Sequence, residues 1–206
     1  MTSFNILFLA YLHYLKEHVN NRRPTRECDY SKLMALSLHQ FFTLNDWFIT
    51  PEFALIGNYS PDYLIGNIIT TPGLNYGKSI NHVVVETKNH NAISWWGLLE
   101  DQAWNECDAT KNSDGKMFFI GLIGFQICFF TFDVSKYPSP SGKYTNFSPL
   151  NLNNFSKEDL DYLEIECLEE SQYNQDVIKV IKWKIDNTKH HPYIIEMFQY
   201  MANNQA

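Results

Sequence analysis

The sequence predicts an α/β (α+β) fold in which helices flank a central mixed β-sheet, and three patterns support this class. Near the start of the chain, apolar residues recur at helical spacing: Phe4, Leu7, Phe8, Tyr11, Leu12 and Leu15. Residues 83–88 are mostly β-branched and predict a buried strand. Residues 117–133 are apolar but interrupted by Gly121 and Gly124, which predicts two buried strands rather than a membrane span.

The expected elements alternate between helices and short strands in the first part of the chain. We expect helices at residues 3–19, from Asp29 or Ser31 to about Asn45, and at residues 91–108 with Ser94 as the cap. We expect strands at residues 53–57 and 63–69, which form a hairpin around a turn at 58–61, and at 83–88. Residues 70–81, which contain Pro and Gly, are expected to form a long loop.

The 206 residues suit one domain with an appendage. We expect residues 1–136 to form the core together with the N-terminal helices. Residues 137–155, rich in Pro, Ser, Asn and Gly, are expected to be a loop or linker. Residues 156–206 are expected to be a C-terminal α/β extension that packs on the core, with a strand at 177–185 and a helix at 191–201.

The charge distribution indicates where a polyanion would bind. The net charge is −7, which argues against a general nucleic-acid binder. Residues 1–90 carry seven basic and seven acidic residues, whereas most of the acidic excess lies at residues 158–176. The early basic residues are Arg22, Arg23, Arg26 and Lys32. A nucleic acid would therefore bind the N-terminal half, and the acidic C-terminal region could contact a protein partner or a second copy of the chain.

The cysteines and the N-terminus indicate an intracellular protein, cytoplasmic or nuclear. The four cysteines are far apart in the sequence and have neither zinc-ligand spacing nor the density of a disulfide framework. The apolar segment at the start of the chain follows no Lys or Arg and precedes no small-residue cleavage site, so we expect neither a signal peptide nor a membrane partner.

Three residues predict the chemistry of the chain: Asp62, Glu86 and Lys88. Glu86 and Lys88 are two positions apart on the predicted strand, so they share one face. If the strand that begins after Asp62 pairs with this one, the two carboxylates meet and repel each other unless a cation lies between them. Oxygen ligands of this kind suit Mg²⁺ or Mn²⁺. Lys88 could orient an attacking water or offset charge that develops on a phosphate.

A simpler interpretation stays open for these residues. Glu86 and Lys88 could form a surface ion pair at a strand end, and Pro61 with Asp62 could be an ordinary turn. Short motifs of this kind also occur by chance.

The order of elements around the three residues resembles the PD-(D/E)XK nuclease superfamily. The matching segments are FALIG at residues 53–57, PDYLI at 61–65, VVVETK at 83–88, the following helix with Gln102, and the hairpin that begins at residue 117. The resemblance covers residues 30–133. It implies a restriction-endonuclease-like core, to which the C-terminal extension is added.

The resemblance also implies roles for individual residues. Asp62 and Glu86 resemble the metal ligands, Lys88 the catalytic lysine and Gln102 an auxiliary polar group. Glu52 is the nearest candidate for a further metal ligand upstream of the Pro-Asp motif, with Glu17 and Glu27 as weaker candidates.

The expected function is that of a metal-dependent endonuclease that hydrolyses phosphodiester bonds of DNA, with RNA less favoured. Mg²⁺ or Mn²⁺ is the expected cofactor. The acidic balance and the C-terminal region depart from typical nucleases. The alternative is a catalytically inactive module of the same fold that binds protein or nucleic acid.

Overall fold

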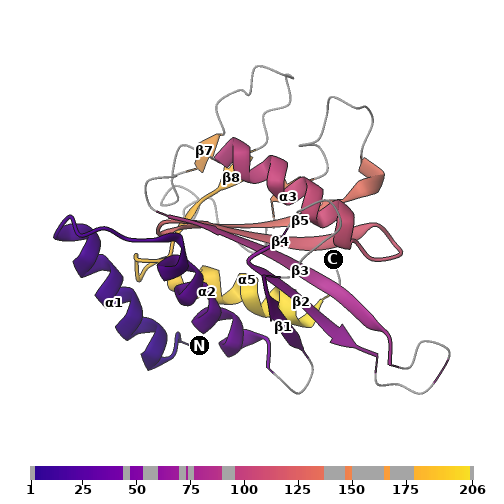
Figure 1. The fold of residues 1–206 in the computed structure, drawn as a ribbon, viewed down its shortest axis with the longest axis horizontal. Coiled ribbons are helices and arrows are strands. Elements are labelled where there is room, and N and C mark those ends of the chain that lie inside the picture. Colours follow the sequence, from indigo (N-terminus) through magenta and orange to yellow (C-terminus); the bar gives the residue numbers. More distant parts are fainter. Residues whose placement is uncertain are drawn as a thin grey trace.

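A central β-sheet separates two layers of helices in the computed structural model of the chain (Figure 1). The structure describes residues 3–43, 47–52, 60–69, 73, 77–89, 96–136, 147–149, 165–167 and 179–204. The helices in these ranges are α1 (Ile6–Asn20), α2 (Glu27–Phe41), α3 (Trp96–Thr110) and α5 (His191–Asn203), with a 3-10 turn at Val134–Lys136. Helix α3 covers one face of the sheet, and α1, α2 and α5 lie on the other side.

The sheet is mixed, as the sequence predicts. Its strands are β1 (Phe48–Pro51), β2 (Tyr63–Ile68), β3 (Ser79–Lys88), β4 (Lys116–Ile123), β5 (Gln126–Asp133), β6 (Phe147–Pro149) and β9 (Trp183–Lys184). The strand order is β1-β2-β3-β4-β5-β6, and β9 pairs with β5. The β3–β4 pair is parallel, and the other described pairs are antiparallel. Strands β7 (Ile165–Cys167) and β8 (Lys179–Ile181) form a separate antiparallel pair.

Strand β3 is central because both of its faces are apolar and buried. Val83 and Val85 pack in the cluster that includes α1, α2 and α5, whereas Val84 packs with Ala103 and Cys107 of α3. This alternation is the expected behaviour of a strand. Glu86, which continues the Val84 face of the same strand, is therefore directed towards α3.

The C-terminal residues join the same core. Ile194, Met197, Phe198 and Met201 of α5 are buried together with residues of α1, α2 and the sheet. Phe41 of α2 and Phe198 stack with their ring centroids 5.0 Å apart. None of the helices in the described ranges combines the length and apolar content that a bilayer crossing requires.

Several expected boundaries differ from those in the structure. Helix α2 begins at Glu27 and ends at Phe41, whereas we expected it to start after Asp29 or Ser31 and reach about Asn45. Asp29 accepts a hydrogen bond from the backbone N–H of Arg26, so it closes a capping box from inside the first turn. The helix therefore starts earlier than expected, and residues 44–46 lie outside the described ranges.

The strand that pairs with β2 also differs from the expectation. The described partner is β1, in which Pro51 lies opposite Tyr63. Residues 53–57, where we expected this strand, lie outside the described ranges, as does Ser94. The expected linker 137–155 contains strand β6, which pairs with β5. The expected strand at 177–185 is divided into β8 and β9, which belong to different sheets.

A β-bulge interrupts the β2–β3 pair. Ile65 lies opposite Val83, but the next residue, Gly66, lies opposite Asn81, so His82 is the extra residue. The backbone approaches Gly66 closely, because a Cβ built there would lie 2.5 Å from the carbonyl oxygen of Ile80. A Phe48 ring carbon would also be 2.5 Å away. Glycine is therefore required beside the bulge.

We expect Gly66→Ala to destabilise the protein by about 2–3 kcal/mol, because the backbone of β3 cannot move away without breaking the sheet pairing. Urea unfolding of both proteins measures this difference. Replacing exposed Ile68 of the same strand by Ala is the control, and it should cost less than about 1 kcal/mol. Equal midpoints for wild type and Gly66→Ala would contradict the close approach.

Candidate functional site

The structure brings Asp62, Glu86 and Lys88 together at one end of the β2–β3 pair. Tyr63 lies opposite Val85, so the next position in this antiparallel register sets Asp62 opposite Glu86. The Asp62 Oδ2 atom accepts hydrogen bonds of 2.6 Å from the backbone N–H and from the hydroxyl of Thr87. These bonds fix the Asp62 side chain at the end of β3.

Glu86 lies inside the protein on the face that α3 covers. Its exposed fraction is 1%, although it is ionisable. It continues the Val84 face of β3, which packs against the α3 residues Ala103 and Cys107. Burial of an unpaired carboxylate is costly, so this position requires a proton or a cation nearby.

Glu106 of α3 is the main residue of this site that the sequence analysis missed. It is 0% exposed and lies next to Glu86. The Nε2 atom of Gln102 donates a 3.1 Å hydrogen bond to Glu106 Oε1, so Gln102 orients this carboxyl group from one helical turn away. Glu106 shares helical spacing with Ala103 and Thr110, but only the structure shows that this face of α3 is buried.

Glu86 and Glu106 form a coupled pair of buried carboxyl groups. Burial raises the pKa of Glu86, and the neighbouring Glu106 and Asp62 charges raise it further. Burial also raises the pKa of Glu106. With both groups ionised, Glu86 Oε1 and Glu106 Oε2 have no hydrogen-bond partner among the described residues. Lys88 contacts only the other oxygen of Glu86, Oε2, so these two buried oxygens favour a shared proton or a bound cation.

Lys88 is the cationic group of the cluster. Its Nζ atom lies 3.1 Å from Glu86 Oε2 and 3.2 Å from Glu27 Oε1, and its side chain is 20% exposed. Burial lowers the pKa of Lys88, but the Glu86 and Glu27 carboxylates raise it more, and the net direction is upward. Lys88 is therefore a charged ammonium at neutral pH.

The three upstream acids occupy different positions. Glu27, at the start of α2, contacts Lys88 and belongs to the cluster. Glu52 is exposed with a φ of 45°, its backbone N–H donates to the Asp62 carbonyl, and its charge acts on Tyr63. Tyr63 hydrogen-bonds to α2 on the opposite face of the sheet from α3. Glu17 contacts Asn21 at the end of α1.

The residues present fit a divalent cation. Glu86 Oε1 and Glu106 Oε2 are two buried carboxylate oxygens without a partner, and Asp62 adds negative charge beside them. In the described ranges, no three His, Cys, Asp or Glu side chains converge on one point. Mg²⁺ does not require three, because it is commonly held by one or two carboxylates with water and substrate phosphates as the other ligands.

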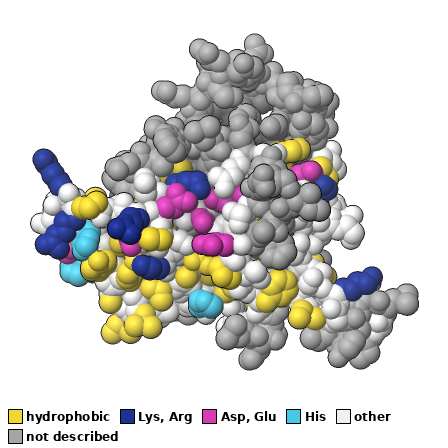
Figure 2. All heavy atoms as spheres, viewed as in Figure 1, with side chains coloured by type: hydrophobic (Ala, Val, Ile, Leu, Met, Phe, Trp, Pro, Cys, Tyr) yellow, Lys and Arg dark blue, Asp and Glu magenta, His cyan; other side chains and the backbone are white. Residues whose placement is uncertain are grey.

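The cluster opens towards the start of α2. Two acids contact Lys88, and Glu27 is the more accessible of them, with 47% of its side chain exposed against 1% for Glu86. Figure 2 shows Asp and Glu side chains gathered near the middle of this face, next to Lys or Arg side chains. Arg22, Arg23 and Arg26 are exposed on the connection that leads into Glu27. These three arginines therefore lie just before Glu27 in the sequence.

We expect the stability of the metal-free protein to fall as pH rises from 5 to 8. The folded Glu86–Glu106 pair keeps a proton that the unfolded chain releases above the ordinary carboxyl pKa, so rising pH favours unfolding. The thermal midpoint should drop by on the order of 5 °C. Thermal unfolding in the presence of a chelator measures this drop.

The matched variant for this prediction is Glu106→Gln. Its amide would donate a hydrogen bond to Glu86 and thereby remove the need for a shared proton. The drop in midpoint between pH 5 and pH 8 should become smaller in this variant. Parallel pH profiles for the two proteins would show that the pair does not retain a proton.

Comparison of the chain with protein-family models, with curated proteins and with solved structures gave no match.

Proposed function

We propose that this chain is a metal-dependent nuclease of the PD-(D/E)XK type that hydrolyses phosphodiester bonds of DNA. The observation that carries the proposal is that Asp62, Glu86 and Lys88 lie near one another at one end of the parallel β3–β4 pair, with Glu106 buried beside Glu86. A surface ion pair, the simpler interpretation, does not account for Glu86 and Glu106 being buried together.

The arrangement of elements supports the same proposal. Helix α2 precedes the antiparallel strands β1, β2 and β3. Helix α3 follows them, and the next strand, β4, is parallel to β3. A restriction-endonuclease-like core has this order of elements. Fold alone does not determine function, so the proposal rests on the side chains that the order brings together.

In this proposal Asp62 and Glu86 would hold Mg²⁺ or Mn²⁺, and Glu106, which Gln102 orients, lies beside Glu86. A divalent ion held there would supply polarisation of the phosphodiester and a lower pKa of a coordinated water. Glu86 and Glu106 would release their shared proton to solvent when such an ion is bound, because both carboxylates would then be stabilised in the ionised form. Thr87 keeps Asp62 in place through its two hydrogen bonds.

Lys88 acts through its charge. Because its pKa is raised, it holds its proton at neutral pH and is not a general base. It orients the attacking water or offsets the negative charge that develops on the phosphate. Glu27 positions the ammonium group through the 3.2 Å contact.

DNA is the proposed partner, and RNA is the less favoured substrate. Arg22, Arg23 and Arg26 are exposed and adjoin Glu27 in the sequence, so they can contact phosphates that approach the cluster. The proposed protein partner or second copy of the chain would bind the acidic region at 158–176. Apart from β7, this region lies outside the described residues. Glu52 as a further metal ligand and the intracellular location also stay predictions.

One observation favours a second candidate, an inactive module of the same fold that binds protein or nucleic acid. Glu86 and Glu106 can share a proton, and this state needs no metal ion for the protein to fold. A module that retained the fold without catalysis could retain this proton-sharing pair.

Cleavage assays distinguish the two candidates. Supercoiled plasmid, single-stranded DNA and RNA would each be incubated with the protein in Mg²⁺, Mn²⁺ or EDTA. The proposal predicts nicking or linearisation of DNA with either metal and none in EDTA. DNA that stays intact with both metals while the protein retards it in a gel would favour the inactive module.

A further inference from the structure

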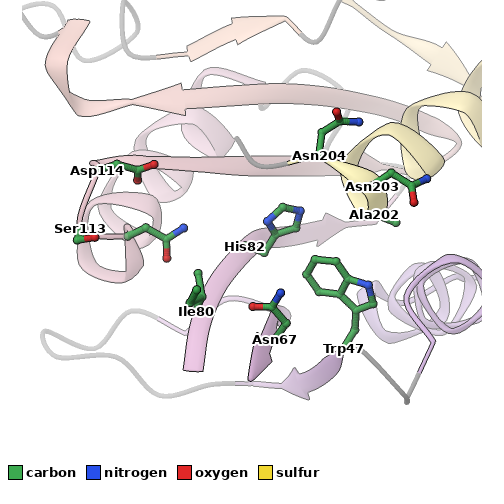
Figure 3. Close-up of a pocket in the computed structure, with 10 residues that line it drawn as sticks. Trp47, Asn67, Ile80, His82, Ser113, Asp114, Ala202, Asn203 and Asn204 are labelled. Carbon is green, nitrogen blue, oxygen red and sulfur yellow. The ribbon is translucent and has the colours of Figure 1, made fainter. Parts of the chain in front are cut away.

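A second site lies at the opposite end of β3 from Glu86. It is a pocket of about 330 Å³ between β2, β3, the α3–β4 connection and the end of α5. Figure 3 shows His82 in the middle of the lining side chains, with Trp47, Asn67 and Asp114 around it. This volume is near the lower end of small-molecule sites and suits a ligand the size of a nucleobase.

The bulge in β3 directs His82 to this pocket. Without it, His82 would continue the Val84 face towards α3. With the extra residue, His82 packs between Trp47 and Phe118, with ring centroids 4.7 and 5.1 Å away, and its Nε2 contacts the Met201 carbonyl of α5. Bulges commonly re-aim a side chain at functional sites.

Three hydrogen-bond acceptors of the pocket lining lie on His82, Asn67 and Asp114. The Met201 carbonyl can only accept, so His82 Nε2 carries the proton, and Nδ1 of the neutral ring is an acceptor. Burial lowers the pKa of His82, which keeps the ring neutral. Asn67 Oδ1 is buried and has no partner among the described residues. Asp114 adds a carboxylate, so a ligand that carries N–H donors would find acceptors here.

The remaining lining defines the shape and charge of the ligand. Trp47, which packs against His82, contributes a flat aromatic ring to the lining, on which a planar ring can stack. The described lining residues include no Lys or Arg, and Asp114 is negative, so the pocket disfavours a phosphate. We propose that this pocket binds a planar nitrogen heterocycle bearing an amino group, a nucleobase of the adenine type, whose two amino N–H groups donate to two of the three acceptors on Asn67, His82 and Asp114.

Isothermal titration with adenosine, inosine and methylguanidine tests the proposal. Adenosine should bind saturably with a dissociation constant on the order of 0.1 mM. Inosine replaces the amino group by a carbonyl oxygen that would face acceptors, so it should bind at least about tenfold more weakly. No saturable binding of adenosine, equal binding of inosine, or tighter binding of methylguanidine would each overturn the proposal.

Asn67→Ala locates the binding site. It removes the unpartnered acceptor and should weaken adenosine binding by about tenfold. Asn20→Ala, at an exposed position at the end of α1, is the matched control and should bind as the wild type does. Circular dichroism would verify that both variants fold. Unchanged binding by a folded Asn67→Ala variant would overturn the assignment to this pocket. The comparison of adenosine with inosine uses the wild-type protein, so it tests the proposal even if the variant does not fold.

Discussion

Replacing Lys88 by Met is expected to lower DNA cleavage by about 100- to 1000-fold, the largest effect on catalysis that we predict for a residue other than a metal ligand. Met has a similar length and lacks the charge. The variant loses the ammonium group held 3.1 Å from Glu86 and 3.2 Å from Glu27, which would stabilise the charge that develops on the phosphate. The rate of plasmid nicking under saturating Mg²⁺ measures the effect.

Lys111→Met is the matched control for Lys88. Lys111 also forms an ion pair with a carboxylate, Asp108 Oδ1 at 2.6 Å, but it follows the last residue of α3 and its described ion pair is with Asp108. Its loss should change the nicking rate by less than about twofold, because surface ion pairs contribute little. A Lys88→Met protein that is folded and cleaves as fast as the wild type would refute the role of Lys88.

Glu86→Gln is expected to change stability and activity in opposite directions. The neutral amide can donate to Glu106 and accept from Lys88, so the metal-free variant should be more stable than the wild type at pH 8 by about 1–2 kcal/mol. Loss of a metal ligand should at the same time lower cleavage by about 1000-fold. Urea unfolding and plasmid nicking measure the two effects.

The control for Glu86 is Glu196→Gln, an exposed position on α5. Its unfolding free energy should change by less than about 0.5 kcal/mol, and its activity should not change. A Glu86→Gln variant that is less stable than the wild type in the absence of metal at pH 8 would contradict the inference that the buried carboxyl pair destabilises the folded protein.

The core of the fold was predictable because its signals are local. The β-branched run predicted β3, and the alternation of its side chains predicted that Glu86 shares a face with Val84. These two features follow from the sequence periodicity of a single strand. That Asp62 would meet Glu86 was conditional on the pairing of the two strands, and the described register shows that they pair.

The rest depended on contacts between distant segments. Glu106 was missed because a single acid on a helix is normally solvated, and only the packing of α3 on β3 shows that it is buried. Strand β1 was missed because residues 48–51, although Phe48, Ile49 and Thr50 favour strands, form a run of only four residues that ends in Pro51, which is acceptable at a sheet edge. Gly66 lies beside the β-bulge, but a glycine in a strand does not by itself indicate that His82 is the extra residue of β3.

Titration of Mn²⁺ by calorimetry into the wild type and into the Asp62→Ala, Glu86→Ala double variant tests the central claim most directly. We expect saturable binding to the wild type and its loss in the double variant, because these two carboxylates are the proposed ligands. Thermal unfolding without metal would verify that the double variant is folded. Equal binding to both proteins, or no binding to the wild type, would contradict the assignment of a metal site at the end of β3.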